Sequence, residues 1–190
     1  MTPELRNPIG THVTVGKGLV AGALASVDEV GYETLQVFTG NPRGWAHSPG
    51  RPAEDERFRE ECARRGLRAF IHAPYLVNLG SPTPLTWERS VGVVAHNLRR
   101  AVEIGAEGVV VHTGSYVDPT GSRAQYDAAM RRVREGLLPV LEALDGAVAP
   151  WLLLEPTAGQ GQSLCAGVDD LEPYLDALDH HPRVGICLET

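Results

Sequence analysis

The feature that most constrains the fold is a regular alternation of short apolar segments with helical patterns. The apolar segments are rich in β-branched residues and predict six strands, at residues 9–13, 34–39, 68–72, 108–112, 151–155 and 184–189. Each is apolar nearly throughout, which is typical of a strand buried on both faces. Helical patterns separate them, at residues 19–30, 52–65, 86–104, 122–144 and 168–178. Gly136 and Pro139 predict a break in the fourth helix.

Strands that alternate with helices predict a parallel sheet covered by helical crossovers. A closed barrel of eight such units would need roughly 250 residues, whereas this chain has 190. The pattern therefore leaves two architectures open: an open doubly wound sheet, or a barrel without its last quarter. Neither a linker nor a low-complexity tract divides the chain, so we expect a single domain.

Composition narrows the possible partners and the compartment. The formal net charge of −7 argues against nucleic-acid binding through a global positive field, but not through a local patch. The three scattered cysteines are predicted to be reduced thiols. Apolar runs fall short of the roughly 20 residues that span a bilayer, and the N-terminus lacks the apolar core of a secretory signal. We therefore expect a cytoplasmic protein with no membrane partner.

Polar residues end several predicted strands. His72, His112, Glu155 and Glu189 end the third to sixth strands. The carboxyl ends of parallel strands open onto one face, which holds the active site in such folds. Imidazole and carboxylate together suit zinc, manganese or iron, and a set without cysteine favours an open, catalytic site. His12, at the end of the first strand, is predicted either to orient a metal ligand or to have an unrelated role.

The loops after the second and third strands carry residues suited to nucleic acid. Arg43 and Trp45 fit phosphate contact and stacking, although a turn with a packed Trp explains them equally well. Tyr75 and Leu76 could enter a base stack as a wedge, or simply cap the mouth of a barrel. The remaining histidines fall in loop or helix context and are predicted to lie on the surface: His47, His96, His180 and His181.

Six stretches in chain order resemble one known family. They are IGTHV at 9–13, FTGNPRGW at 38–45, HAPYLVNL at 72–79, HTGS at 112–115, LEPTAGQG at 154–161 and RVGICL at 183–188. The set is similar to the endonuclease IV family of apurinic/apyrimidinic endonucleases, also called deoxyribonuclease IV. The resemblance implies a TIM (β/α)8 barrel, here incomplete with about six βα units. Strands 7 and 8 would be absent from a single, C-terminally truncated domain over residues 1–190.

The resemblance also implies an activity and a ligand set. The activity is hydrolysis of the phosphodiester 5′ to an abasic site in duplex DNA, leaving a 3′-hydroxyl during base excision repair. By the family pattern, His72 and His112 would hold one of three Zn²⁺ ions, and Glu155 would be a catalytic ligand that bridges it to a second. The position of Glu189 would belong to that second ion. Loop residues would contact the DNA: Asn41, Arg43, Tyr75 and Leu76.

The sequence departs from the family pattern in ways that lower the expected activity. Glu189 stands where the family has Asp, and Pro156 stands where Asn is common. Thr113 and Tyr116 replace Pro and His after the fourth-strand histidine. The 190 residues offer ligands for one zinc ion and part of a second. We therefore expect a partial member with reduced activity, and a monomer if full-length.

Two alternatives stay open. Sugar isomerases and epimerases of the xylose-isomerase-like barrels also place histidine and carboxylate around a divalent metal at strand ends. These sugar enzymes do not need the loop residues Arg43, Tyr75 and Leu76, which therefore distinguish the endonuclease hypothesis from the sugar-enzyme hypothesis. A remnant that binds abasic DNA without cutting it is the other alternative.

Overall fold

The computed structural model describes residues 7–118, 120–144, 150–159 and 161–189. Gln160, which belongs to one of the resembling stretches, and Thr190 lie outside this range. The strands are β1 (Gly10–His12), β2 (Thr34–Val37), β3 (Arg68–His72), β4 (Gly108–His112), β5 (Trp151–Glu155) and β6 (Val184–Ile186). The helices are η1 (Leu19–Leu24), α1 (Ala25–Val30), α2 (Pro52–Arg65), α3 (Pro84–Ile104), α4 (Arg123–Glu142), η2 (Val168–Asp170) and α5 (Leu171–Ala177).

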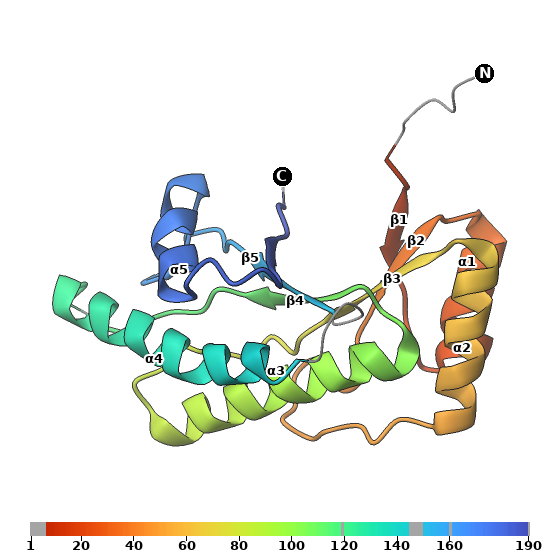
Figure 1. Ribbon diagram of the computed structural model, residues 1–190, viewed down its shortest axis with the longest axis horizontal. Coiled ribbons are helices and arrows are strands. Elements are labelled where there is room, and N and C mark those ends of the chain that lie inside the picture. The colour runs from red at the N-terminus through yellow and green to blue at the C-terminus, as the bar shows by residue number, and fades with distance from the viewer. Residues whose placement is uncertain (1–6, 119, 145–149, 160, 190) are drawn as a thin grey trace.

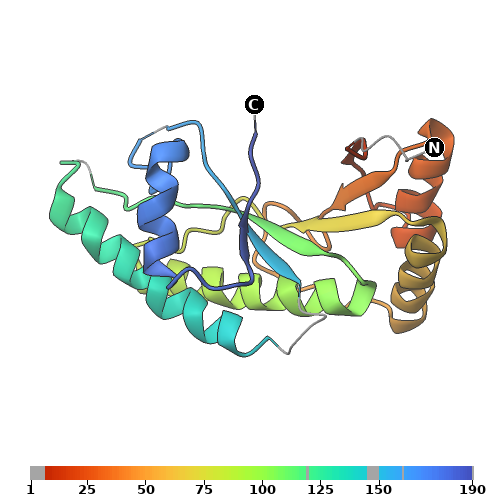
Figure 2. The same cartoon turned by 45° about the horizontal axis from the view of Figure 1, so that its top comes forward.

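The order of the strands decides between the two predicted architectures. All six form one parallel sheet in the order β1-β2-β3-β4-β5-β6, so each strand pairs with its neighbours in the sequence. A doubly wound sheet would reverse its order at a switch point, whereas the wall of a barrel does not. The helices follow one side of the curved sheet, with α1 and α2 at one end, α3 and α4 along it and α5 at the other end (Figures 1 and 2). The fold is therefore a partial TIM barrel, as the resemblance implied.

The strands differ in burial according to their place in the sheet. In β3, β4 and β5 the apolar side chains are largely buried, as predicted. The edge strand β1 is exposed along its length and β6 is only half-buried, so the prediction of burial on both faces was wrong for them. Each edge strand has one neighbour instead of two. The strand β6 also ends at Ile186, earlier than predicted, so Glu189 lies beyond it.

The predicted break in the fourth helix is also wrong, because α4 runs unbroken from Arg123 to Glu142 with Pro139 inside it. Proline removes one backbone hydrogen bond, but Leu137 and Leu141 are buried and hold this turn against the core. Gly136 lets α3 approach closely: a Cβ there would lie 2.6 Å from Cγ2 of Val91. Packing against α3 thus overrides the local helix-breaking signal.

The core lies between the sheet and the helices, and α5 is joined to it through a polar contact. Tyr174 of α5 is fully buried, and its hydroxyl donates a hydrogen bond of 3.1 Å to the carbonyl oxygen of Thr113, just after β4. Burial raises the pKa of this phenol, so it stays a donor.

Among the described helices, none combines the length and the apolar character that a membrane crossing demands.

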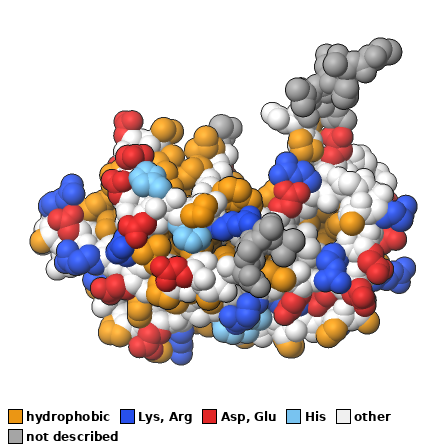
Figure 3. Space-filling view, in the orientation of Figure 1, with side chains coloured by type: hydrophobic (Ala, Val, Ile, Leu, Met, Phe, Trp, Pro, Cys, Tyr) orange, Lys and Arg blue, Asp and Glu red, His pale blue; other side chains and the backbone are white. Residues whose placement is uncertain are grey.

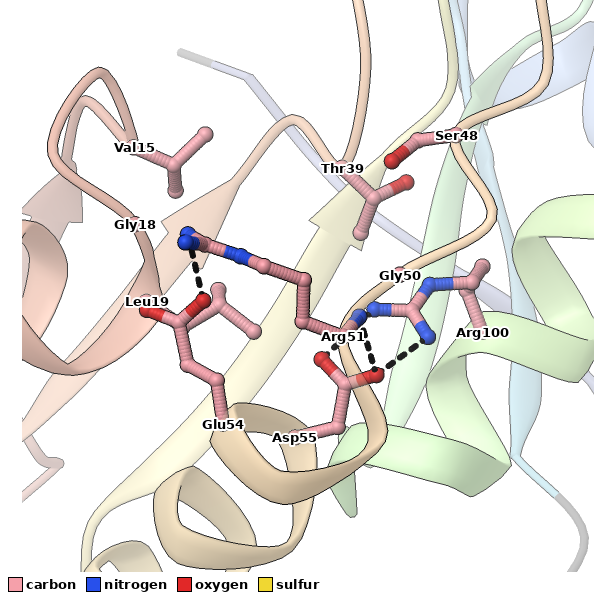
Figure 4. Close-up of a pocket in the computed structure, with 10 residues that line it drawn as sticks. All are labelled: Val15, Gly18, Leu19, Thr39, Ser48, Gly50, Arg51, Glu54, Asp55 and Arg100. Carbon is pink, nitrogen blue, oxygen red and sulfur yellow. Dashed lines mark hydrogen bonds and ion pairs between the residues drawn. The ribbon is translucent and has the colours of Figure 1, made fainter.

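A buried ion pair joins α2 to α3. Nη1 and Nη2 of Arg100 donate to the two carboxylate oxygens of Asp55 at 2.7 and 2.8 Å, as Figure 4 shows. Both side chains are almost fully buried, with 4% and 7% of their area exposed. The pair Arg134–Asp179 has the same bidentate form, with distances of 2.6 and 2.7 Å, but it lies on the surface. Arg100 also pairs with the half-exposed Glu103, and Arg134 also donates to the carbonyl oxygen of Ala177, so the largest difference between the two pairs is burial.

We predict that Arg100→Met lowers the free energy of unfolding by about 3 kcal/mol or more, because it leaves the Asp55 carboxylate buried beside no cation. Arg134→Met is the matched control and should leave stability nearly unchanged, because water solvates Asp179. Urea denaturation followed by circular dichroism measures both. Equal losses in the two variants would contradict the assigned role of burial.

Candidate metal centre

Three of the predicted ligands converge where β3, β4 and β5 end. Nε2 of His72 lies 3.2 Å from Oε2 of Glu155, and Nε2 of His112 lies 3.3 Å from the same oxygen. The ligand atoms all lie within 4.8 Å of one another. Parallel pairing produces this arrangement, since His112 stands directly across from Glu155 in the register of β4 and β5.

The hydrogen bonds of His72 show which of its ring nitrogens is free to bind a metal. Its Nδ1 lies 2.6 Å from the carbonyl oxygen of Ala73, which can only accept, so Nδ1 carries the proton. In the neutral ring, Nε2 then presents a lone pair to the Glu155 carboxylate. Two such groups repel each other unless a proton or a metal cation lies between them. This ligand set therefore fits a metal ion.

Electrostatics keeps Glu155 in the form that binds cations. The two imidazole rings beside the carboxylate, His112 first and then His72, lower the pKa of Glu155 to about 2, against the opposing effect of burial. The carboxylate is thus ionised near neutral pH. Its side chain is 12% exposed and that of His72 is 8% exposed, whereas His112 is 35% exposed. The centre is therefore closed on the His72 side and open beside His112.

A pocket of about 430 Å³ opens next to His112. The loops after β3, β4 and β5 form its walls, and Tyr75 and Leu76 line it together with Ser115 and Thr157. Tyr75 is 52% exposed and Leu76 is 38% exposed, so both apolar surfaces face solvent rather than the core. The Tyr75 ring also lies 5.6 Å from the ring of His112, centroid to centroid. A ligand in this pocket would contact Tyr75 and Leu76 together with the cluster of His72, His112 and Glu155.

The loop after β2 meets the loop that carries Tyr75. The backbone N–H of Tyr75 donates to the carbonyl oxygen of Pro42 at 2.9 Å. Asn41 shapes the turn, since its Oδ1 accepts from the N–H of Arg43 at 2.9 Å. Arg43 itself is exposed. The structure thus brings Asn41, Arg43 and Tyr75 to neighbouring loops at the same end of the sheet.

Two predicted site residues lie outside the three-residue cluster. The His12 ring is 6.3 Å from that of His72, and Phe38 lies 4.5 and 5.2 Å from the two rings, centroid to centroid. His12 Nδ1 is hydrogen-bonded to Gln36 at 2.9 Å. Glu189 is exposed, and it does not belong to the group that closes around Glu155 in the described part of the chain.

The structure adds residues that the sequence did not single out. Oδ1 of Asn78 accepts from the N–H groups of Gly80 and Ser115, at 3.1 and 3.0 Å, so it ties together the loops after β3 and β4. Asn78 lies within a stretch that carries the family resemblance, which was the available signal. Two of the histidines predicted to lie on the surface, His96 and His181, are instead half-buried, and the His96 ring stacks on that of His47 at 4.5 Å.

The surface carries both signs of charge. On the face in Figure 3, basic and acidic side chains are interspersed rather than gathered into one positive area. This agrees with the net charge of −7. Attraction of a polyanion to this face would therefore depend on local groups.

Comparisons with known proteins agree with this geometry. A "Probable endonuclease 4" from Streptomyces avermitilis is 52% identical over 190 residues, which is all of this chain and 60% of that protein. The crystal structure of endonuclease IV from Thermus thermophilus superposes with a TM-score of 0.78 at 34% identity, over 96% of this chain and 62% of that one. The chain thus spans about 60% of the length of such relatives. The sequence identity and the superposition together confirm the resemblance to endonuclease IV.

A more distant structure shares the fold alone. The D-tagatose 3-epimerase-like protein superposes with a TM-score of 0.68 at 17% identity, over 95% of this chain and 64% of that one. The family described as xylose isomerase-like TIM barrels matches residues 24–190. The chain therefore belongs to the xylose isomerase-like TIM barrel family.

Proposed function

We propose that this protein is a zinc-dependent endonuclease that cuts DNA 5′ to abasic sites in base excision repair and leaves a 3′-hydroxyl. The observation that carries the proposal is the cluster of His72, His112 and Glu155 beside a pocket lined by Tyr75 and Leu76. Relatives named endonuclease 4 support a nuclease. We further propose that residues 1–190 form one partial barrel domain, monomeric in the full-length protein and cytoplasmic.

The ligand distances fit zinc as well as other small divalent metals. Two zinc bonds of about 2.1 Å at a tetrahedral angle separate their ligand atoms by about 3.4 Å. The nitrogen–oxygen distances of 3.2 and 3.3 Å are close to this value. His72, His112 and Glu155 would hold the ion and leave a position open, and we propose that Glu189 reaches toward a second ion. When bound, zinc would activate water and stabilise negative charge on the phosphate.

The protein's own residues would bind and orient the DNA. Arg43 would contact a phosphate, while Tyr75 and Leu76 would fill the space in the duplex beside the abasic nucleotide. Asn41 would hold the turn that presents Arg43. His12 would help to orient His72 through Phe38. Since the family pattern has further ligands beyond the sixth strand, we propose that these 190 residues alone cut slowly.

Incision of a duplex with one abasic site tests this function. We expect a cut 5′ to the site, a product that a polymerase can extend, and no cut in undamaged duplex. Glu155→Gln should lower the incision rate by about 100-fold or more, because it removes a charged ligand. Binding without incision at any zinc concentration would favour the non-cleaving remnant. Activity only on a ketose or aldose would favour the sugar isomerase.

We predict that His112→Ala loses its bound zinc after dialysis against a weak chelator, because one of three protein ligands is removed. His180→Ala is the matched control, since His180 belongs to an exposed group with Glu172 and Asp176 that has the same donor types. It should retain the zinc of the unaltered protein. Atomic absorption measures zinc per chain. Equal zinc in the two variants would overturn the assignment of His112.

We predict that Arg43→Ala lowers affinity for abasic duplex about tenfold or more, because a charge-assisted contact to phosphate is lost. It should also reduce the slope of log affinity against log salt by about 1, the effect of one phosphate contact. Arg131→Ala, which removes an exposed arginine from α4, is the control. Fluorescence anisotropy at several salt concentrations measures both. An unchanged slope in Arg43→Ala would exclude Arg43 from phosphate contact.

A further inference from the structure

One turn of α3 places three polar residues against the segment that joins β2 to α2. They are His96, Asn97 and Arg100, and the last two are each only 4% exposed. Polar side chains are rarely buried on a helix unless each finds a specific partner. Each of the three contacts a residue between Thr39 and Asp55, and Arg100 also pairs with Glu103 of its own helix.

Asn97 holds the start of that segment. The hydroxyl of Thr39, two residues after β2, donates to Oδ1 of Asn97 at 3.1 Å. The amide Nδ2 of Asn97 in turn donates to the carbonyl oxygen of Val93 at 2.8 Å. That second bond fixes which end of the amide faces Thr39. The Asn97 oxygen is therefore an oriented acceptor for the start of the segment.

Arg100 holds the end of the segment. It binds Asp55, whose Oδ2 also accepts from the N–H of Arg51 at 3.1 Å. Gly50 has a φ of +73° and lies directly against the guanidinium, because a Cβ there would be 2.0 Å from Nη1. Figure 4 shows Gly50 and Arg51 beside Arg100 and Asp55. Only glycine allows this contact between backbone and guanidinium.

His96 supports the middle of the segment. Its ring stacks on that of His47, with centroids 4.5 Å apart and planes inclined by 7°. Burial, and to a lesser degree the neighbouring His47, lowers the pKa of His96, so it is neutral near pH 7. A neutral ring favours the stack, since two imidazolium rings at this distance would repel each other.

Between these three contacts the segment forms the exposed turn that carries Arg43. We propose that Asn97 and Arg100, with His96, are positioning residues that hold residues 39–51 in a preformed shape and so present Arg43 to DNA. The presentation to DNA rests on the proposed function. A segment already ordered loses less conformational entropy on binding, which strengthens each contact that it makes.

The test removes one anchor with the least damage to the core. Thr39→Val keeps the shape of the side chain and deletes the hydroxyl that Asn97 accepts from. We expect faster hydrogen–deuterium exchange of amides 40–50 without DNA, and about three- to tenfold weaker binding of abasic duplex. Thr34→Val is the matched control: its hydroxyl donates to the carbonyl oxygen of Arg68 at 2.9 Å, at the other end of β2. It should change neither measurement, and Thr39→Ser should restore both.

A double-mutant cycle shows whether the effect passes through Arg43. In an Arg43→Ala background, Thr39→Val should no longer weaken binding, because the group that it positions is gone. An undiminished loss in that background would overturn the proposal, as would unchanged exchange in Thr39→Val. If the unaltered protein fails to bind abasic duplex, the proposed function fails. The exchange of amides 40–50 then still decides whether the anchors order the segment.

Discussion

Parallel pairing of β4 with β5 sets His112 directly across from Glu155, and the rest of the candidate site depends on this register. A slip of one residue would turn Glu155 to the opposite face of the sheet. The same pairing places the loops after β3, β4 and β5 at one end, where they enclose the pocket beside His112. The chemistry of the centre and the shape of its opening therefore have one physical cause.

Within the cluster of His72, His112 and Glu155, two hydrogen-bond acceptors face each other. Nδ1 of His72 donates its N–H to a backbone carbonyl, so in the neutral ring Nε2 faces the Glu155 carboxylate as a lone pair. A protein that needed only a stable strand end would avoid this opposition of acceptors in a half-buried place. A cation between the two groups would relieve it. This opposition of acceptors would be the physical basis for the proposed binding of a metal ion.

Sequence reasoning succeeded where local pattern and tertiary structure agree. The predicted bounds of β3, β4, β5 and α2 match the observed ones, because apolar runs and glycine stops coincide with buried strands and helix ends. It failed where distant packing decides. Packing against α3 keeps α4 unbroken through Pro139, and His96 stacks on His47, which lies in a loop far away in the sequence. Glu189 was predicted to lie on the sixth strand, whereas β6 ends at Ile186, before it.

If a chain with a net charge of −7 binds DNA as proposed, it must do so through local structure. One exposed arginine on a mobile loop would add little, because ordering the loop would oppose the gain from a single phosphate contact. The buried polar turn of α3 removes that cost during folding, before any ligand arrives. Asp55 and Arg100 are expensive to bury, and their exchange for apolar residues would spare that cost. What an apolar replacement could not supply is a directed bond to the N–H of Arg51 and a flat surface for Gly50. The ion pair is therefore better explained by the shape that it imposes on residues 39–51 than by stability alone.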